Sequence, residues 1–271
     1  MNVALTIAGS DSGGGAGIQA DLKTFHRFGV FGTSVITAIT AQNTLGVTEW
    51  EAVRPELVKS QIDAVASDLR PAAFKTGMLA TSSIVRVVAD GIRKYGLSNY
   101  VLDPVMVATS GDLLIEDDAV ASIRDELLPL ADLITPNADE ASVLAGFTVN
   151  TEDDMQRAAE AIAALGSKAV LIKGGHIRGG DSATVVDCLY DGSFITYRHP
   201  RIETTNTHGI GCTLSAAITA SLANGSSLRD AVQAATDFVH EAIATAPGLG
   251  HGSGPLNNFA GSAPTNSRTS A

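Results

Sequence analysis

The sequence predicts an α/β domain whose sheet is mostly parallel and carries helices on both faces. The chain has 271 residues, and 45% of them are hydrophobic, which is enough for a large buried core. Apolar runs of strand length alternate with segments of helical period, and Gly, Pro, Asn or Asp marks each change. No linker or repeat divides the chain, so we expect one domain over residues 1–259 and a frayed polar tail over residues 260–271.

Strands and helices alternate through the first half of the chain. Short, mostly apolar runs predict strands over residues 3–8, 34–41, 48–53, 73–76, 100–103 and 133–135. Between them, apolar residues that recur with helical period predict helices over residues 18–28, 55–68, 82–95 and 117–128. Pro55 suits the first turn of its helix, where no N–H is needed. This order is typical of βαβ units with a parallel sheet.

The second half continues the alternation and ends in two helices. We expect helices over residues 138–145 and 153–165, then a strand over residues 169–173. A hairpin of strands 183–190 and 194–199 is expected around the turn dipeptide Asp191-Gly192. Two Ala-rich helices, 211–223 and 228–245, close the fold. Ligands of such sheets bind outside the carboxyl ends of the strands, so candidate functional residues are those just after each strand.

The charge balance excludes several classes of partner. Eighteen Lys and Arg against 29 Asp and Glu give a formal net charge of −11, which offers no attraction to nucleic acid or to an anionic membrane. The apolar run at the N-terminus is short and has no Lys or Arg before it, so we expect no signal peptide. The most continuous later apolar stretch, near residues 214–223, is too short for a membrane span. Cys188 and Cys212 lack zinc-binding spacing, and we expect a cytoplasmic protein.

The first strand leads into a cluster of five glycines within residues 9–17. This segment is either a flexible turn or a loop whose free N–H groups favour an anion or a polar acceptor. Residues 15–20 fit the loose dinucleotide-binding pattern, but Gln42-Asn43 stand where that pattern needs an acidic residue, which disfavours a dehydrogenase. No Lys follows a Gly, so the Walker A loop of ordinary P-loop enzymes is absent.

The strongest candidate site is the segment 204–213, which leads into an apolar helix. Gly209 and Gly211 let consecutive N–H groups point at one spot, and the helix N-terminus adds partial positive charge, which suits a phosphoryl group in transfer. Cys212 is either a small buried hydrophobe or a reactive thiol, and the helix end alone is too weak to ionise it. We expect His208 to be a turn residue rather than the partner of this thiol.

Two further strand ends are acidic. Asp103 follows one strand, and Asn137, Asp139 and Glu140 follow the next. These acidic groups are either favourable first-turn charges of a helix or oxygen ligands for Mg²⁺. Lys173 ends a later strand beside two glycines, from where it could reach a phosphate.

Seven segments in order form one pattern: residues 8–21, 40–43, 75–79, 103–106, 137–140, 173–176 and 206–212. In this pattern the chain resembles the hydroxymethylpyrimidine/phosphomethylpyrimidine kinases of thiamin biosynthesis, which belong to the ribokinase-like superfamily. The resemblance extends over residues 3–259. It implies a ribokinase-like three-layer sandwich that uses MgATP to phosphorylate 4-amino-5-hydroxymethyl-2-methylpyrimidine and then its monophosphate. We also expect a homodimer.

The resemblance also implies roles for individual residues. It assigns the pyrimidine pocket to Gln42, Gly9, Asp21, Met78 and Val105. It assigns ATP binding to Lys173, Asn137, Thr207 and Ile210, the metal to Asp103 and Glu140, and the anion hole and catalysis to Gly209, Gly211 and Cys212. Cys212 takes the place where most ribokinase relatives carry an aspartate base.

Three positions depart from the family's usual pattern, and three other functions stay open. Ile210 stands where Thr or Ala is common, Thr109 replaces a frequent Lys, and Asn258 replaces a common His. A pyridoxal kinase is the close alternative, although the amide of Gln42 can pair with both an amino group and a ring nitrogen of an aminopyrimidine. The remoter alternatives are a non-catalytic ligand-binding module and a Cys-dependent hydrolase, which would need a base and a residue to orient it.

Overall fold

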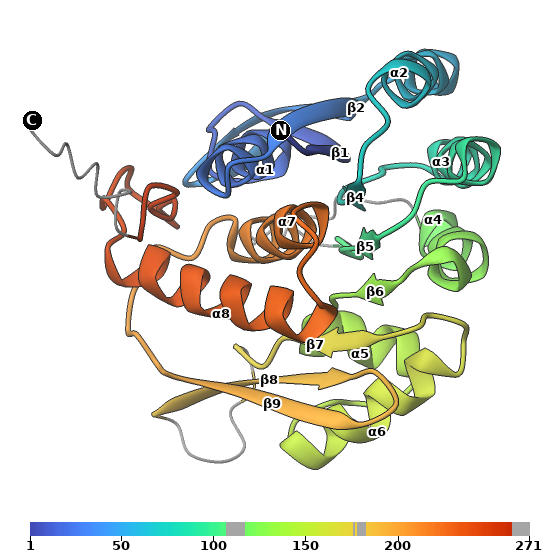
Figure 1. Cartoon of the computed structure of the whole chain (residues 1–271). Coiled ribbons are helices and arrows are strands. Elements are labelled where there is room, and N and C mark those ends of the chain that lie inside the picture. Colours follow the sequence, from blue (N-terminus) through green and yellow to red (C-terminus); the bar gives the residue numbers. More distant parts are fainter. Residues whose placement is uncertain (107–116, 176, 178–182, 262–271) are drawn as a thin grey trace, which may run out of the picture.

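The computed structural model describes residues 1–106, 117–175, 177 and 183–261, which form one nine-stranded sheet with helices on both faces (Figure 1). The order of strands across the sheet is β3-β2-β1-β4-β5-β6-β7-β8-β9. The strands are β1 (Val3–Asp11), β2 (Phe31–Asn43), β3 (Gly46–Ala52), β4 (Ala73–Thr76), β5 (Tyr100–Leu102), β6 (Leu133–Ile134), β7 (Val170–Ile172), β8 (Thr184–Tyr190) and β9 (Phe194–Pro200).

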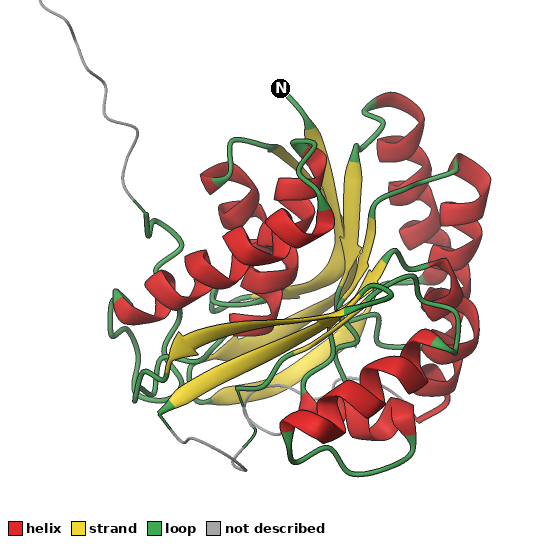
Figure 2. Cartoon of the chain, turned by 60° about the horizontal axis from the view of Figure 1, so that its bottom comes forward, coloured by secondary structure: helices red, strands yellow, loops and turns green. Residues whose placement is uncertain are grey.

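Most neighbouring strands pair in parallel. Pairing is parallel from β2 across to β7, whereas β3 at one edge and the β8–β9 hairpin at the other are antiparallel (Figure 2). Every residue of β4, β5, β6 and β7 is buried, because helices cover both faces of the centre. The predicted mostly parallel sheet is therefore confirmed, as is the hairpin around Gly192.

The helices form two outer layers (Figure 1). They are α1 (Gly17–Arg27), α2 (Pro55–Asp68), α3 (Ser82–Tyr95), α4 (Asp117–Ser122), α5 (Ala138–Ala145), α6 (Glu152–Ala163), α7 (Ile210–Ala223) and α8 (Leu228–Ala244). Helices α2 to α6 cover one face of the sheet, and α1, α7 and α8 cover the other. Side chains of α7 and α8 pack on β5 to β8, so the start of α7 reaches the carboxyl ends of the central strands.

Local sequence explains where several helices begin and end. Thr81 caps α3, with its hydroxyl accepting from Ile84 N, and Gly96 ends the helix in a left-handed conformation with φ +57. Asn137 caps α5 in the same way, and Gly146 ends it with φ +78. These boundaries match the predicted helices over residues 82–95 and 138–145.

The structure differs from the prediction in two places. The predicted helix over residues 117–128 is α4 followed by a π-helical turn at Ile123–Leu127 and a 3-10 turn at Leu128–Leu130. Pro129 has no N–H to donate, so α-helical bonding cannot continue through it. Strands β1 and β2 are longer than predicted because β1 pairs with β2 as far as Asp11, opposite Thr40, and the last residues of β2 pair with β3.

Some predictions concern residues outside the described part of the chain. These are residues 262–271 of the expected tail, Thr109 and His176. Among the helices that the structure does describe, none combines the length and the hydrophobicity that crossing a bilayer requires.

Candidate active site

A cavity of about 660 Å³ lies at the carboxyl ends of β1, β4, β5 and β7 and at the start of α7. Residues from both halves of the chain line it, including nearly every predicted site residue. These are Gly9, Gln42, Met78, Asp103, Val105, Asn137, Glu140, Lys173, Thr207, Gly209, Ile210, Gly211 and Cys212. The predicted substrate, phosphate and metal residues therefore share one cavity.

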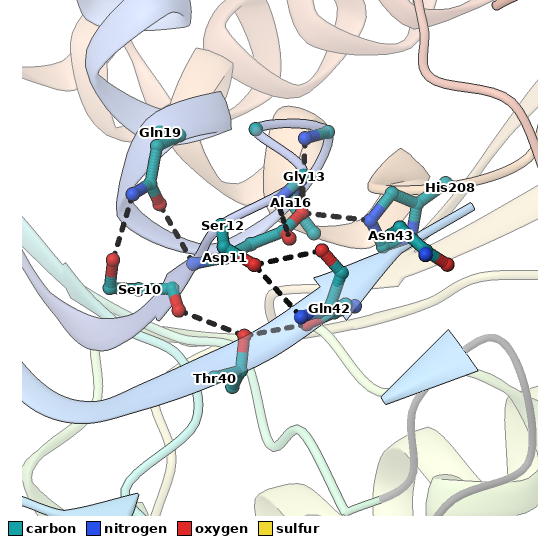
Figure 3. A network of polar contacts seen from close by, with 12 residues as sticks. Ser10, Asp11, Ser12, Gly13, Ala16, Gln19, Thr40, Gln42, Asn43 and His208 are labelled. Atoms are coloured by element: carbon teal, nitrogen blue, oxygen red, sulfur yellow. Dashed lines mark hydrogen bonds and ion pairs between the residues drawn. The ribbon is translucent and has the colours of Figure 1, made fainter. Parts of the chain in front are cut away.

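The glycine cluster after β1 folds around the side chain of Asp11 (Figure 3). Asp11 Oδ1 accepts a hydrogen bond from Gly13 N at 2.7 Å, and Oδ2 accepts from Gly15 N at 3.0 Å and from Ala16 N at 2.8 Å. His208 Nε2 lies 2.9 Å from the same Oδ2. The prediction that these amides favour an anionic ligand is corrected, because the chain's own carboxylate is the anion that they bind.

Four of the residues predicted to hold the pyrimidine, Gly9, Gln42, Met78 and Val105, line the cavity. Thr40 Oγ1 lies 3.1 Å from Gln42 Oε1. Ser12 Oγ donates to Gln42 O and accepts from Gln42 N, both at 2.8 Å. A Cβ on Gly9 would lie 3.0 Å from Met78 Sδ, so Gly9 leaves room for the thioether to pack closely against the end of β1. The chain thus holds an amide and a thioether beside the end of β1.

The start of α7 presents backbone amides to the cavity. Gly209 caps the helix with φ +83, a left-handed conformation that suits glycine. Within the described residues, no acceptor takes a hydrogen bond from the N–H groups of residues 209–212. A Cβ on Gly211 would lie 3.1 Å from Lys173 Nζ, so these amides and the lysine face the same space. Such an arrangement of amides and a nearby cation suits an anion.

Asp103 and Lys173 form an ion pair beside these amides. Lys173 Nζ lies 3.0 Å from Asp103 Oδ1 and 3.9 Å from Glu140 Oε2. Thr135 Oγ1 donates to Asp103 Oδ1 and Ser215 Oγ donates to Oδ2, both at 3.2 Å. Burial acts to raise the pKa of Asp103, but the nearby lysines outweigh it and hold the pKa below its usual value. Asp103 is therefore an anion at neutral pH.

Glu140 is held by the first turn of α5. Asn137 N donates to Glu140 Oε2 at 2.8 Å, and Glu140 N donates to Asn137 Oδ1 at 2.9 Å. Burial raises the pKa of Glu140 to about 7, with a contribution from the charge of Asp103, while Lys173 acts in the opposite direction. A further positive charge at this place would favour the ionised form.

The donor set around Asp103 and Glu140 fits Mg²⁺ bound in part by a ligand. Among the described residues, no group of three or more His, Cys, Asp or Glu side chains could hold a metal. Mg²⁺ commonly takes only one or two carboxylates and completes its shell with water and phosphate oxygens. Two acidic side chains beside the amides at the start of α7 are compatible with that mode.

Cys212 lies in the first turn of α7 and lines the cavity. Burial raises the pKa of this thiol to about 11, and the nearby Lys75 ammonium acts in the opposite direction without reversing the shift. His208 Nε2 contacts Asp11, and the main chain of His208 lies in an isolated β-bridge with Pro255 rather than in a turn. Among the residues that the structure describes, no histidine pairs with Cys212, so none of them supplies the base that a Cys-dependent hydrolase needs.

The structure places Asp21 outside the pyrimidine pocket. Its side chain is fully buried, Lys75 Nζ lies 2.8 Å from its Oδ1, and Thr6 Oγ1 donates to its Oδ2 at 2.6 Å. Asp21 therefore cannot contact a substrate directly. Lys75 lines the cavity, so the pair supports the floor of the site.

Sequence reasoning gave no role to Asp11 or Lys75. Lys75 carried a usable signal, because a charged residue in a short apolar strand at the sheet centre needs a buried partner. The far end of the cavity is formed by α8, where Thr236, Val239 and His240 line it.

Because of Asp187 on β8, we expect the free energy of unfolding to depend on pH. Its Oδ1 accepts from Gly174 N at 2.9 Å, and burial raises its pKa from 3.8 to about 6. The folded state therefore holds this proton more tightly than the unfolded state, and the free energy of unfolding falls as pH rises from about 4 to about 6. Asp187→Asn should be more stable than wild type by up to about 3 kcal/mol at pH 8.

The measurement is urea unfolding of both proteins at pH 4.5, 6 and 8. The difference in unfolding free energy should grow with pH and level off above pH 7. A difference that does not change with pH would contradict a buried carboxylate with a raised pKa.

Known proteins resemble this chain over almost its whole length. The family described as phosphomethylpyrimidine kinase matches residues 11–257. The hydroxymethylpyrimidine/phosphomethylpyrimidine kinase of Rhizobium meliloti is 54% identical over 262 residues, which cover 95% of this chain and 97% of that protein. The protein of the same description from Bacillus subtilis is 50% identical over 258 residues, covering 95% and 94%.

Solved structures agree with the fold. The ADP complex of Bacillus subtilis pyridoxal kinase has a TM-score of 0.88 and 39% sequence identity, and the match covers 96% of this chain and 98% of that one. This likeness confirms the ribokinase-like α/β architecture. From the family match and the identity to the two bacterial kinases, the chain belongs to the phosphomethylpyrimidine kinase family and is a phosphotransferase.

Proposed function

We propose that this chain transfers the γ-phosphoryl group of ATP to the hydroxyl of 4-amino-5-hydroxymethyl-2-methylpyrimidine, and then phosphorylates the monophosphate to the diphosphate. The observation that carries the proposal is the row of amides at residues 209–212, which have no acceptor in the described chain and face the cavity that also holds Gln42. A phosphate donor and a small ring would meet between these two groups.

The phosphate end uses positive charge and backbone donors. Lys173, Asn137, Thr207 and the amides of residues 209–212 would bind the ATP phosphates. Asp103 and Glu140 would hold Mg²⁺, which neutralises charge on the phosphates when it is bound. Burial in this cavity strengthens each of these interactions relative to water.

The ring end distinguishes substrates. Gln42, placed by Thr40 and Ser12, would pair with the amino group and a ring nitrogen of the pyrimidine. Met78, Val105 and Gly9 would contact the ring. The hydroxymethyl group would then point toward residues 209–212 and attack the γ-phosphorus in line.

Transfer depends more on position and charge than on proton removal. The transition state of phosphoryl transfer is largely dissociative, and negative charge spreads over the transferred oxygens, where the free amides and Lys173 would stabilise it. The hydroxyl proton must still leave. Cys212 would accept it only as a thiolate, and Lys75 is the buried cation that would stabilise that form.

Cys212→Ala should therefore affect the two steps differently. The hydroxymethyl group must lose a proton, whereas the oxygen of the monophosphate is already ionised. We expect kcat to fall by about 10²-fold for the first step and by less than about tenfold for the second. Initial rates with each substrate at saturating ATP measure this, with products identified by mass.

Cys188→Ala is the matched control, because Cys188 is the other free cysteine and is buried on β8. It should leave both rates within about twofold of wild type. Equal losses in the two steps of Cys212→Ala would remove Cys212 from the proton-accepting role.

Pyridoxal phosphorylation is the second candidate function, because the fold matches a pyridoxal kinase at a TM-score of 0.88. A coupled ATPase assay should compare hydroxymethylpyrimidine, its monophosphate and pyridoxal side by side. The proposal requires the highest kcat/KM with the pyrimidines. No turnover of either pyrimidine would overturn it, and preference for pyridoxal would assign the alternative.

The remaining expectations are a homodimer and a cytoplasmic location, both inferred from the resemblance and the composition. Light scattering of the purified chain at micromolar concentration tests the first. Fractionation of the source cells tests the second.

A further inference from the structure

We propose that Asp11 and His208 form a latch that holds the pyrimidine end of the cavity against its phosphate end, and that both are positioning residues for phosphoryl transfer. The proposal rests on the proposed function for the choice of substrates. Neither residue needs to contact a ligand. Their effect would be to set the distance between the hydroxyl and the γ-phosphate.

The latch joins segments far apart in sequence. His208 Nε2 and Asp11 Oδ2 are 2.9 Å apart, their side chains are 8% and 3% exposed, and 197 residues separate them in the chain. Asp11 keeps its pKa below the usual value because hydrogen bonds from His208 and Ala16 outweigh the opposing effect of burial. An ionised carboxylate only accepts hydrogen bonds, so His208 Nε2 is the donor.

Each residue of the latch is next to residues that line the cavity, and Figure 3 shows Asp11 in contact with His208 and close to Ser12 and Gln42. From Asp11 the chain passes to Ser12, whose hydroxyl bonds both main-chain groups of Gln42 at 2.8 Å. From His208 it passes directly to Gly209, the first of the free amides. His208 N also donates to Gly254 O at 3.0 Å, so the histidine is fixed at its main chain and at its ring.

Close packing makes the latch rigid. A Cβ on Gly15 would lie 2.4 Å from His208 Cδ2, and one on Gly209 would lie 1.9 Å from Gly15 O. The two glycine loops are therefore in direct backbone contact, with no room to slide. Release of the hydrogen bond, or a methyl group at residue 15, should let the two ends of the cavity separate.

The latch also compensates the negative charge of the Asp11 carboxylate. A carboxylate this close to a phosphate site would repel the ligand if it were exposed. Three backbone amides and the His208 ring share its charge instead. Loss of the histidine donor should therefore both loosen the loops and leave a less compensated anion.

The kinetic test compares His208→Met, which removes the donor, with His208→Gln, whose amide nitrogen can still reach Asp11. We expect His208→Met to lower kcat by about 10- to 100-fold while KM for ATP and for the pyrimidine each change less than about threefold. His208→Gln should recover most of the loss. The Asp11→Asn/His208→Met double variant should be no slower than the slower single variant, because the two residues act as a unit.

Two further variants distinguish an effect on the positions of the two loops from an effect on the stability of the fold. Gly15→Ala changes no polar group and should lower kcat like His208→Met. Tyr100→Phe is the matched control, because it removes a buried 2.7 Å hydrogen bond to Thr76 without changing a residue that lines the cavity. It should lower stability and leave kcat per folded protein unchanged.

Amide hydrogen exchange tests the latch with a measurement that does not depend on enzyme activity. In His208→Met, peptides covering residues 12–17 and 207–213 should both exchange faster than in wild type, and in Tyr100→Phe neither should. If the wild type fails to phosphorylate the pyrimidines, the proposed function falls and this measurement still tests the latch. Unchanged kcat in His208→Met and Gly15→Ala, a loss confined to KM, or faster exchange in only one peptide would each overturn the latch.

Discussion

Lys173→Met should lower kcat/KM for ATP by about 10³-fold, which corresponds to the upper end of the loss of a preorganised donor at a transferred phosphate. Lys173 Nζ would lie 3.1 Å from a Cβ placed on Gly211, beside the free amides of α7, and it also neutralises Asp103 at 3.0 Å and Glu140 at 3.9 Å. Methionine keeps the length of the side chain and removes the charge. The two carboxylates would then repel the phosphates that the lysine attracts.

Initial rates over a range of ATP concentrations measure this effect at saturating pyrimidine. Lys168→Met is the matched control, because Lys168 pairs with Asp132 at 2.6 Å on the surface and its side chain is 77% exposed. It should change kcat/KM by less than about twofold. A loss smaller than tenfold in Lys173→Met would place the γ-phosphate elsewhere in the cavity.

The order and type of the elements could be read from the sequence because each is encoded by neighbouring residues. Strands β4 to β7 are buried on both faces and appear as short apolar runs, and α5 begins at the cap of Asn137. The lengths of β1 and β2 could not be read, since the last residues of β1 pair with β2 and the last residues of β2 pair with β3, and such pairing is not encoded by neighbouring residues. Pro129 marked the end of the predicted helix but not the π-helical turn before it.

Parts of the site were predictable because their residues stand at the boundaries of predicted strands and helices. Lys173, Asp103 and Gly209 stand at the ends of strands or the start of a helix, and the topology of parallel sheets brings such positions together. Side-chain partners were not predictable. Asp21 was expected in the pocket because a family pattern names residues and not the direction of their side chains, and its partner Lys75 lies 54 residues away.

The glycine-rich segments 9–17 and 204–213 show why side-chain partners could not be predicted while positions could. Both were predicted as loops with free amides, and the sequence distinguishes them weakly. After β1, a carboxylate of the chain occupies the amides of residues 13, 15 and 16, whereas the amides at residues 209–212 have no acceptor within the described residues. The fold decides which loop binds an external anion, because only contacts across the chain determine where Asp11 points.

Lys75→Met should lower the free energy of unfolding by about 3–5 kcal/mol, the usual cost of breaking one side of a buried ion pair. Both side chains of the pair are fully buried and 2.8 Å apart. Burial raises the pKa of Asp21, and Lys75 is the main group that opposes this rise. Without the lysine, Asp21 is left as a buried carboxylate whose remaining side-chain partner is Thr6.

The Lys75→Met/Asp21→Leu variant distinguishes an ion pair from general packing. When both charges are replaced by apolar side chains of similar size, no charge remains buried, so the double variant should be more stable than Lys75→Met alone. Urea unfolding at pH 7 of the wild type, both single variants and the double variant gives the coupling free energy. The double variant should fold and yet phosphorylate hydroxymethylpyrimidine more slowly than the wild type, because the cation beside Cys212 is gone. A cost below about 1 kcal/mol for Lys75→Met would contradict the buried pair, and full activity of the double variant would show that Lys75 supports the fold and not the thiolate.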